Sequence, residues 1–449
     1  MSERVIHCPA GTIRGRSDGG VARFPGIPFA EAPVGSLRFQ ATERRGSFIE
    51  PFDAFDLGAT PQRGRPYPRT VIPEPSIPGD DILSLNIWAP ERAAGSDVPL
   101  PVLVWIHGGG YLAGSPASPW YEGSAIARGG VVFVSVSYRL GVEGFGLIDG
   151  GANRALLDWV TALEWVRDNI GAFGGDAGRV TVGGQSAGGG AVLTLLGTPS
   201  ARPLFSRAFA MSPIDASLSA DLAAGIAGTL ASDLGIPPTS AGFATVEPEA
   251  LQGAAIALAQ SGGEATMLPF APVHGVDPLP MDVRRALHTH GRDKPLLIGS
   301  TSDEFDSPRV QQVSPSGRVT DWLFRAVVPR TARARASGSA ATWLYSFEWV
   351  SPVFGGAAHC TDIPYFLGTT ARAEAALGPD VPDSLARTMH ADLVAFVHGE
   401  ELPWPPGAGR QGDAVRVYGS PASDTGSSIV AGGYDDVLPL IDMPWEGPA

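Results

Sequence analysis

Short, continuous apolar runs bounded by glycine or polar residues recur along the first half of the chain. Pro101–Ile106 (PVLVWI) leads directly into a His-Gly-Gly-Gly segment, and Val131–Ser137 (VVFVSVS) is a second run of the same kind. Such runs are typical of strands buried on both faces. Residues 154–170 instead carry apolar side chains at helical spacing, and Gly171 follows as a helix stop.

Short apolar runs and segments with helical spacing continue to alternate toward the C-terminus. Alternating strands and helices predict an α/β fold with a mostly parallel central sheet covered by helices on both faces. A small antiparallel part is expected at residues 11–39, a surface loop at 58–80, and helices outside the sheet at 216–260. The remaining expected strands are Ile82–Trp88, Arg179–Gly183, 207–212, 295–300, 342–348 and 414–418, and the remaining helices are Ala187–Leu196 and 382–398.

Length and composition agree with a large globular protein. The chain has 449 residues, of which 44% are hydrophobic and 17% charged, enough apolar surface for a substantial core. At about 150 residues per domain the length alone suggests about three domains. One extended α/β sheet can fill such a length, and we expect a single domain over residues 1–449 with a helical insertion at about 214–290.

Charge and cysteine content exclude some partners. The net charge of −14 argues against a nucleic-acid partner, which would require clustered Lys and Arg. Only Cys8 and Cys360 are present, the N-terminus has no apolar run typical of a signal peptide, and no apolar stretch reaches the length of about 20 residues that spans a bilayer. We expect a soluble cytoplasmic protein without a membrane partner.

The segment Gly184-Gln185-Ser186-Ala187-Gly188 matches G-x-S-x-G. This motif places a serine nucleophile on a sharp strand-to-helix turn, which needs small neighbours. A chain with 58 glycines can match a loose pattern by chance. The expected strand before Ser186 and the expected helix after it supply the context that the motif requires, and they favour a functional nucleophile.

The tandem glycines after the first apolar run predict an oxyanion hole. Backbone N–H groups of Gly109 and Gly110, together with that of Ala187, can bind the oxygen of a tetrahedral intermediate without interference from side chains. The alternative is an ordinary glycine turn. His107 precedes this loop and is expected to be structural rather than a base.

A serine hydroxyl needs a base to remove its proton. His359 follows an expected strand, at the carboxyl edge where open α/β sheets place catalytic groups; the competitors are His274, His390 and His398. The acid should lie between serine and histidine in the chain. Asp303 and Glu304 both follow the 295–300 strand, and spacing alone leaves the choice between them open.

Other chemistry finds no support in the sequence. No cluster has metal-ligand spacing, and no P-loop or dinucleotide-type glycine pattern is present. We therefore predict neither a cofactor nor a metal. Cys360, next to His359, is expected to be a free thiol rather than a nucleophile.

The chain resembles the type-B carboxylesterases, the family that contains the cholinesterases and bacterial p-nitrobenzyl esterases. The resemblance covers most of the chain, and its stretches together are highly specific to the family. They are Gly11–Gly15, Phe24–Ala30, Pro33–Phe39, Asp81–Trp88, Ser137–Gly141, Asn169–Asp176, the segment around Ser186, and Leu204–Ala208.

The resemblance implies an α/β-hydrolase fold and roles for matching positions. Glu304 matches the family's acid, which decides against Asp303, and His359 matches its histidine. Gly109, Gly110 and Ala187 match the oxyanion donors, and Ser212 matches a serine that supports the triad in the family.

Several positions depart from the family pattern. Gln185 stands where the family usually has Glu, which removes a charge beside the site. Ile82 replaces a cysteine of a family disulfide, in keeping with an intracellular member. The region 305–358 is shortened, which predicts a more open pocket, and the 60–80 loop lacks the tryptophan that cholinesterases use against choline.

The sequence therefore predicts a serine carboxylesterase that hydrolyses small to medium carboxylic esters through an acyl-enzyme. The alternatives are a non-catalytic binding member of the same fold, or an amidase, thioesterase or lactonase with the same triad. The expected partner is a small-molecule ester, and the expected state is a monomer or weak homo-oligomer.

Overall fold

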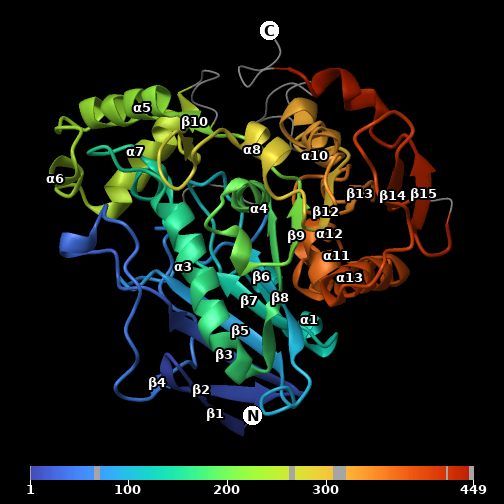
Figure 1. The fold of residues 1–449 in the computed structure, drawn as a ribbon, viewed down its shortest axis with the longest axis horizontal. Helices are drawn as coiled ribbons and strands as arrows, with labels where there is room; N and C mark the ends of the chain where they lie inside the picture. The colour runs from blue at the N-terminus through green and yellow to red at the C-terminus, as the bar shows by residue number, and fades with distance from the viewer. Residues whose placement is uncertain (1, 65–70, 262–267, 307–319, 421–422, 444–449) are drawn as a thin grey trace.

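A long central sheet runs through the computed structural model, which describes residues 2–64, 71–261, 268–306, 320–420 and 423–443 (Figure 1). Its strands lie in the order β1 (Ser2–Cys8), β2 (Gly11–Asp18), β3 (Val21–Pro28), β5 (Ser84–Pro90), β7 (Val132–Val136), β6 (Leu100–Ile106), β8 (Gly175–Gln185), β9 (Arg207–Met211), β12 (Leu296–Thr301), β13 (Thr342–Phe347), β14 (Ala414–Tyr418) and β15 (Ser427–Ala431), with β4 (Phe52–Asp53) beside β2.

The middle of the sheet is parallel and its edges are antiparallel. Strands β7, β6, β8, β9, β12, β13 and β14 pair in parallel, whereas β1, β2, β3 and β5 pair antiparallel at one edge and β15 does so at the other. Parallel strands end at the same edge of a sheet, so the loops that follow β6, β8 and β12 share that edge.

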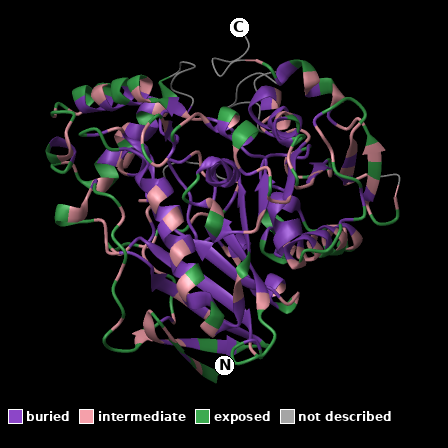
Figure 2. Ribbon diagram, in the orientation of Figure 1, coloured by how far each residue is buried: buried purple, intermediate pink, exposed green. Residues whose placement is uncertain are grey.

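Side chains alternate between two cores on opposite faces of the sheet. In β6, Val104 packs into one core, while Leu103 and Trp105 pack into the other. Figure 2 shows the strands of the sheet buried between covering elements. The first face is covered by α2 (Gly141–Phe145), α3 (Arg154–Asn169), α4 (Ala187–Gly197), α8 (Val283–Thr289) and α10 (Val327–Arg335), and the second by α1 (Ser124–Arg128), α11 (Ile363–Leu367), α12 (Glu374–Leu377) and α13 (Asp383–His398).

The helical insertion lies at one end of the molecule, away from the N-terminal strands. Its helices are α5 (Ala220–Asp233), α6 (Ser240–Phe243) and α7 (Pro248–Gln260), drawn at the upper left of Figure 1. A short parallel pair, β10 (Leu218–Ser219) and β11 (Val273–His274), brings the two ends of these helices together.

The expected strands and helices are present, with shifted bounds, and residues 65–70 of the loop expected at 58–80 lie outside the described residues. The strand expected at Arg179–Gly183 is longer and spans Gly175–Gln185, because both glycines after Val182 stay in the ladder next to β6. Strand β1 was not expected, since its alternating pattern is short and its residues are largely exposed. None of the helices formed by the described residues combines the length and apolar character needed to span a bilayer.

Candidate active site

Ser186 sits on a strained turn between β8 and α4. Its backbone has φ 58° and ψ −123°, a conformation that residues with a side chain rarely adopt. The turn is held because the Ser186 N–H donates to the Met211 carbonyl oxygen at 2.9 Å. A Cβ on Gly188 would lie 2.1 Å from the Ile106 carbonyl oxygen, so only glycine permits α4 to start this close to β6.

The turn leaves Ser186 partly exposed beside the N-terminus of α4. The side chain lies at the carboxyl end of β8 and keeps 8% of its surface exposed within an otherwise buried segment. Ala187 is the first residue of α4, so its N–H has no intrahelical acceptor and carries the positive end of the helix dipole. A negative charge that develops beside Ser186 is therefore stabilised.

The glycine loop after β6 lies against this turn. A Cβ on Gly108 would be 3.1 Å from the Cβ of Ser186, which shows how closely the two segments approach. Gly109 and Gly110 have φ values of +113° and +62°. Their N–H groups donate no hydrogen bond to another described residue, so both remain available as oxyanion donors.

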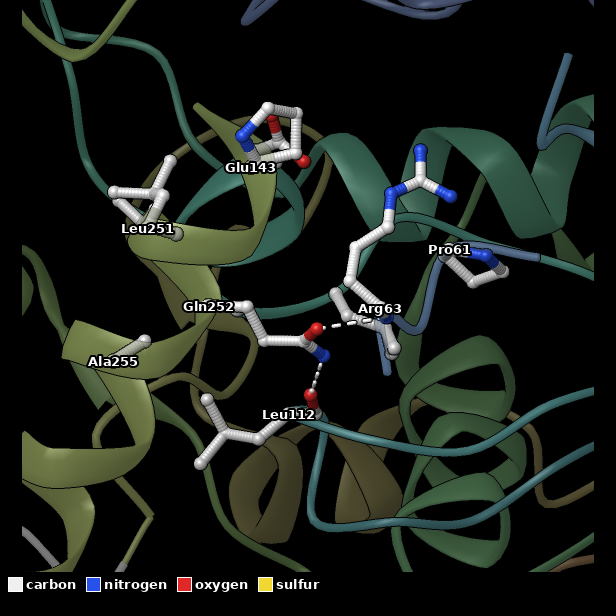
Figure 3. Close-up of a pocket in the computed structure, with 11 residues that line it drawn as sticks. Pro61, Arg63, Leu112, Glu143, Leu251, Gln252 and Ala255 are labelled. Carbon is white, nitrogen blue, oxygen red and sulfur yellow. Dashed lines mark hydrogen bonds between the residues drawn. The ribbon is translucent and has the colours of Figure 1, made fainter. Parts of the chain in front are cut away.

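A hollow beside this loop is held together by Gln252 of the helical insertion (Figure 3). The Gln252 Nε2 donates to the Leu112 carbonyl oxygen at 2.9 Å, and its Oε1 accepts from the Arg63 N–H at 2.8 Å. The hollow encloses about 20 Å³, room for about one water molecule rather than a substrate. Gln252 therefore ties the segment after the glycine loop to α7.

His107 has the structural role that the sequence predicts. Its ring stacks on Tyr138 with centroids 4.4 Å apart, and its Nδ1 lies 2.8 Å from the Gly108 carbonyl oxygen. Burial lowers the pKa of His107 to about 4. The imidazole is therefore neutral near pH 7 and fixes the start of the glycine loop.

Glu304 and His359 meet although they come from different loops. Nδ1 of His359 makes a short hydrogen bond to Oε2 of Glu304, while Oε1 of Glu304 accepts from the Thr301 N–H at 3.0 Å. The His359 N–H also donates to the Glu304 carbonyl oxygen at 2.8 Å. Glu304 is 1% exposed and His359 6%, so the pair is shielded from water.

The geometry separates Glu304 from Asp303. Oδ2 of Asp303 accepts from the Ala357 N–H at 2.7 Å, so this carboxylate holds the loop before His359 instead of the imidazole itself. The competing histidines are engaged elsewhere. His274 contacts Ser217, His390 contacts the Phe366 carbonyl oxygen, and His398 contacts that of Gly129.

Two aromatic rings fix the imidazole of His359. Phe305 stacks on it with centroids 4.6 Å apart, and Phe324 packs against it at 4.7 Å. Phe324 belongs to the shortened 305–358 region, so this region still supports the histidine. Sequence reasoning missed both rings, and the position of Phe305 directly after Glu304 was the one available signal.

Gln185 links the serine turn to His359. Its Nε2 lies 3.1 Å from Nε2 of His359, and its Oε1 is buried without a partner among the described residues. Ser186 Oγ makes no hydrogen bond to a described residue. The Gln185 amide, rather than the Ser186 hydroxyl, therefore faces Nε2 of His359.

Ser212, Asp362 and Cys360 are three further buried residues with polar side chains. The Ser212 hydroxyl is buried and has no hydrogen-bond partner among the described residues. Burial raises the pKa of Asp362 to about 7, the negative charge of Glu304 adds to the rise, and the Tyr345 hydroxyl donates to Asp362 Oδ2 at 3.1 Å. Cys360 is a buried free thiol, and burial raises its pKa well above the usual value.

Comparisons with known proteins identify the family of the chain. Residues 2–316 match the family model described as the carboxylesterase family. The chain is 31% identical over 445 residues to para-nitrobenzyl esterase of Bacillus subtilis (strain 168), covering 88% of this chain and 89% of that protein. It is also 31% identical to phenmedipham hydrolase of Pseudarthrobacter oxydans, in an alignment that covers 90% of this chain and 93% of that protein.

Solved structures give the same result. A p-nitrobenzyl esterase structure superposes with a TM-score of 0.84 at 26% identity, covering 98% of this chain and 100% of that chain. A thermophilic p-nitrobenzyl esterase structure superposes with a TM-score of 0.83 at 27% identity, covering 98% of this chain and 99% of that chain. The chain therefore belongs to the carboxylesterase family, with its α/β-hydrolase fold, and is a serine hydrolase of carboxylic esters.

Proposed function

We propose that Ser186, His359 and Glu304 form the catalytic triad of this esterase. The observation that carries the proposal is the hydrogen bond between His359 and Glu304 beside a serine held on a strained turn. A base oriented by a buried acid next to an activated hydroxyl is the arrangement that acyl transfer requires.

The proposed reaction has two stages. Ser186 Oγ attacks the ester carbonyl while His359 Nε2 takes its proton, and His359 then gives this proton to the leaving alcohol. Water, activated by the same histidine, releases the acid from the acyl-enzyme. Glu304 holds the imidazole in the tautomer with Nδ1–H and stabilises the imidazolium.

The oxyanion of each tetrahedral intermediate is proposed to bind three backbone N–H groups, those of Gly109, Gly110 and Ala187. The two glycine groups have no partner among the described residues, and the Ala187 group starts a helix. Each donor is worth about 10²–10³ in rate in comparable sites.

We assign Gln185 the role of adapting to both protonation states of the base. Its amide N–H donates to Nε2 of the neutral imidazole, at 3.1 Å. When His359 becomes protonated, a half-turn of the amide would bring the unpartnered Oε1 to the new Nε2–H. We propose Ser212 as a residue that supports the triad; its buried hydroxyl has no hydrogen-bond partner among the described residues.

Substrates are proposed to be small to medium carboxylic esters, hydrolysed without a cofactor or metal by a single domain that spans residues 1–449. A cytoplasmic location and a monomeric or weakly associating state complete the proposal. The unpaired thiols of Cys8 and Cys360 are compatible with a reducing compartment.

Labelling by a fluorophosphonate tests the nucleophile. We expect one equivalent of label on the peptide that contains Ser186, and loss of labelling in Ser186→Ala. Label on another serine, such as Ser212, would overturn the assignment. Hydrolysis of matched p-nitrophenyl butyrate and p-nitrobutyranilide then compares ester with amide, and a preference for the anilide would contradict the proposed substrate class.

A further inference from the structure

A second hollow lies at the edge of the sheet opposite the proposed active site. It has a volume of about 550 Å³ and is bordered by Leu100, the first residue of β6, and by Gly130, just before β7. The glycine loop of the proposed oxyanion hole follows the other end of β6, about 20 Å away for a strand of seven residues. The hollow, among β1, β2 and α1 at the lower end of Figure 1, is therefore separate from the triad.

Three arginines from separate segments line this hollow. Arg4 lies on β1, Arg92 follows β5, and Arg128 is the last residue of α1. The lining contains one carboxylate, that of Glu91. Three positive charges against one negative charge leave a surplus of two positive charges, on a protein whose net charge is −14.

The Glu91 carboxylate already has partners. Its Oε1 forms a short ion pair with Arg4 Nη2 and accepts from the Ser17 hydroxyl at 2.9 Å. Both contacts lower the pKa of Glu91, so the carboxylate is ionised at neutral pH. Arg92 and Arg128 form no side-chain hydrogen bond or ion pair with a described residue. The surplus charge of the hollow therefore resides on these two arginines.

The backbone of the lining also presents free donors rather than free acceptors. Gly19 and Gly20 form the hairpin turn between β2 and β3, with φ values of +56° and +79°, and their N–H groups donate no hydrogen bond to a described residue. The carbonyl oxygens of Gly20, Pro90 and Ala127 already accept from backbone N–H groups. Free donors beside occupied acceptors favour a ligand that is rich in acceptor oxygens.

We propose that this hollow binds a small organic dianion, either a phosphate monoester or a dicarboxylate. The surplus of two positive charges matches the charge of such a ligand, and each guanidinium offers a planar fork of donors that fits a carboxylate or a phosphate. Pro90, Leu100 and Ala127 offer an apolar surface to its carbon skeleton. The inference is independent of the function proposed for the triad.

Size and charge favour a small ligand over an extended polyanion. A volume of about 550 Å³ is within the range of small-molecule sites. A nucleic acid requires clustered Lys and Arg over a wide face, and the negative net charge of this protein opposes its approach.

The test is calorimetric titration of the full-length enzyme with matched probes at about pH 8. Phenyl phosphate carries nearly two negative charges at this pH, whereas phenyl sulfate has almost the same shape and carries one. Phthalate represents the dicarboxylates. Each probe is titrated into the wild type, Arg92→Gln, Arg128→Gln and the control Arg372→Gln, which removes an equal charge at an exposed position outside the hollow.

We expect at least one dianion to bind the wild type about tenfold more tightly than phenyl sulfate does. Its affinity should fall about tenfold in Arg92→Gln and in Arg128→Gln and stay unchanged in Arg372→Gln. Because the substituted arginines are exposed, the melting temperatures should match that of the wild type, which separates loss of the site from loss of the fold. The dianion that binds more tightly identifies the ligand as a phosphate monoester or a dicarboxylate.

Three results would overturn the proposal. They are the absence of saturable binding by both dianions, an affinity for phenyl sulfate equal to that for the tighter dianion, and an unchanged affinity in both Arg92→Gln and Arg128→Gln. An equal loss in Arg372→Gln would likewise contradict it, because the effect would then come from the overall charge of the protein.

Discussion

The two halves of the proposed active site are built in different ways. The nucleophile half is one continuous segment, Gly184–Gly188, whose geometry is imposed by backbone fit against β6. The acid–base half joins Glu304 and His359, which lie 55 positions apart, through hydrogen bonds and two phenylalanine rings. The first half therefore depends on a glycine, Gly188, that takes no part in the chemistry, whereas the second depends on a charged group, Glu304.

The largest expected effect comes from a matched pair of variants at the two neighbouring carboxylates, Glu304 and Asp303. Glu304→Gln removes the charge that supports the imidazolium and favours the wrong tautomer, so we expect kcat to fall by about 10⁴. Asp303→Asn removes a carboxylate that accepts from the Ala357 N–H and the Ser302 hydroxyl and does not contact the imidazole, so kcat should fall by less than about tenfold. Steady-state kinetics with p-nitrophenyl butyrate measure both, and equal losses would mean that the two carboxylates share the role.

A steric clash alone should disrupt the half that holds Ser186. In Gly188→Ala the new Cβ meets the Ile106 carbonyl oxygen at 2.1 Å, so α4 must move. We expect the free energy of unfolding to fall by about 1–3 kcal/mol, together with a loss of activity. Gly225→Ala on α5 is the control, because a Cβ at this position would meet no neighbouring atom within 4 Å. This variant should be more stable than the wild type by about 0.5–1 kcal/mol. A stable, active Gly188→Ala enzyme would contradict the close fit.

The buried carboxyl behind the acid–base half should impose a pH dependence on stability. The pKa of Asp362 is raised by burial to about 7 in the folded protein, above the ordinary value of 3.8, so the folded state binds more protons between these values. The contribution of this carboxyl group to stability therefore falls as pH rises through this window. Asp362→Asn removes the penalty, and its advantage in free energy of unfolding should grow by about 1 kcal/mol per pH unit up to about pH 7. Chemical denaturation across this range measures it, and a constant difference would exclude a raised pKa.

The smallest effect is expected where the insertion supports the oxyanion loop. Gln252→Ala removes the hydrogen bonds to the Leu112 carbonyl oxygen and the Arg63 N–H. Because the donors themselves remain, we expect kcat to fall only about three- to tenfold, with KM nearly unchanged. Gln260→Ala at the end of the same helix should have no effect. A loss as large as that of Glu304→Gln would make Gln252 part of the catalytic machinery.

The same contrast explains how much the sequence could predict. The serine turn and the glycine loop are local, so their residues and flanking elements can be read from consecutive positions. Spacing alone could not decide whether Asp303 or Glu304 is the acid, because the choice depends on which carboxylate the imidazole of His359 contacts. Family resemblance favoured Glu304, and the contact with His359 agrees with it.

Features made by distant segments escaped the sequence. Phe324 packs on His359 from the shortened region, and Gln252 of α7 contacts the segment that follows the glycine loop. None of these residues belongs to a periodic pattern or a motif. Their roles depend on tertiary packing, which no local spacing encodes.

The central claim is that Ser186 is the nucleophile of an ester-hydrolysing triad. Its most direct test is hydrolysis of p-nitrophenyl butyrate by the wild-type enzyme and by Ser186→Ala, with matched folding confirmed by circular dichroism. The account predicts turnover in the wild type and a loss of up to about 10⁶ in kcat in the variant. Equal turnover in both proteins would contradict it.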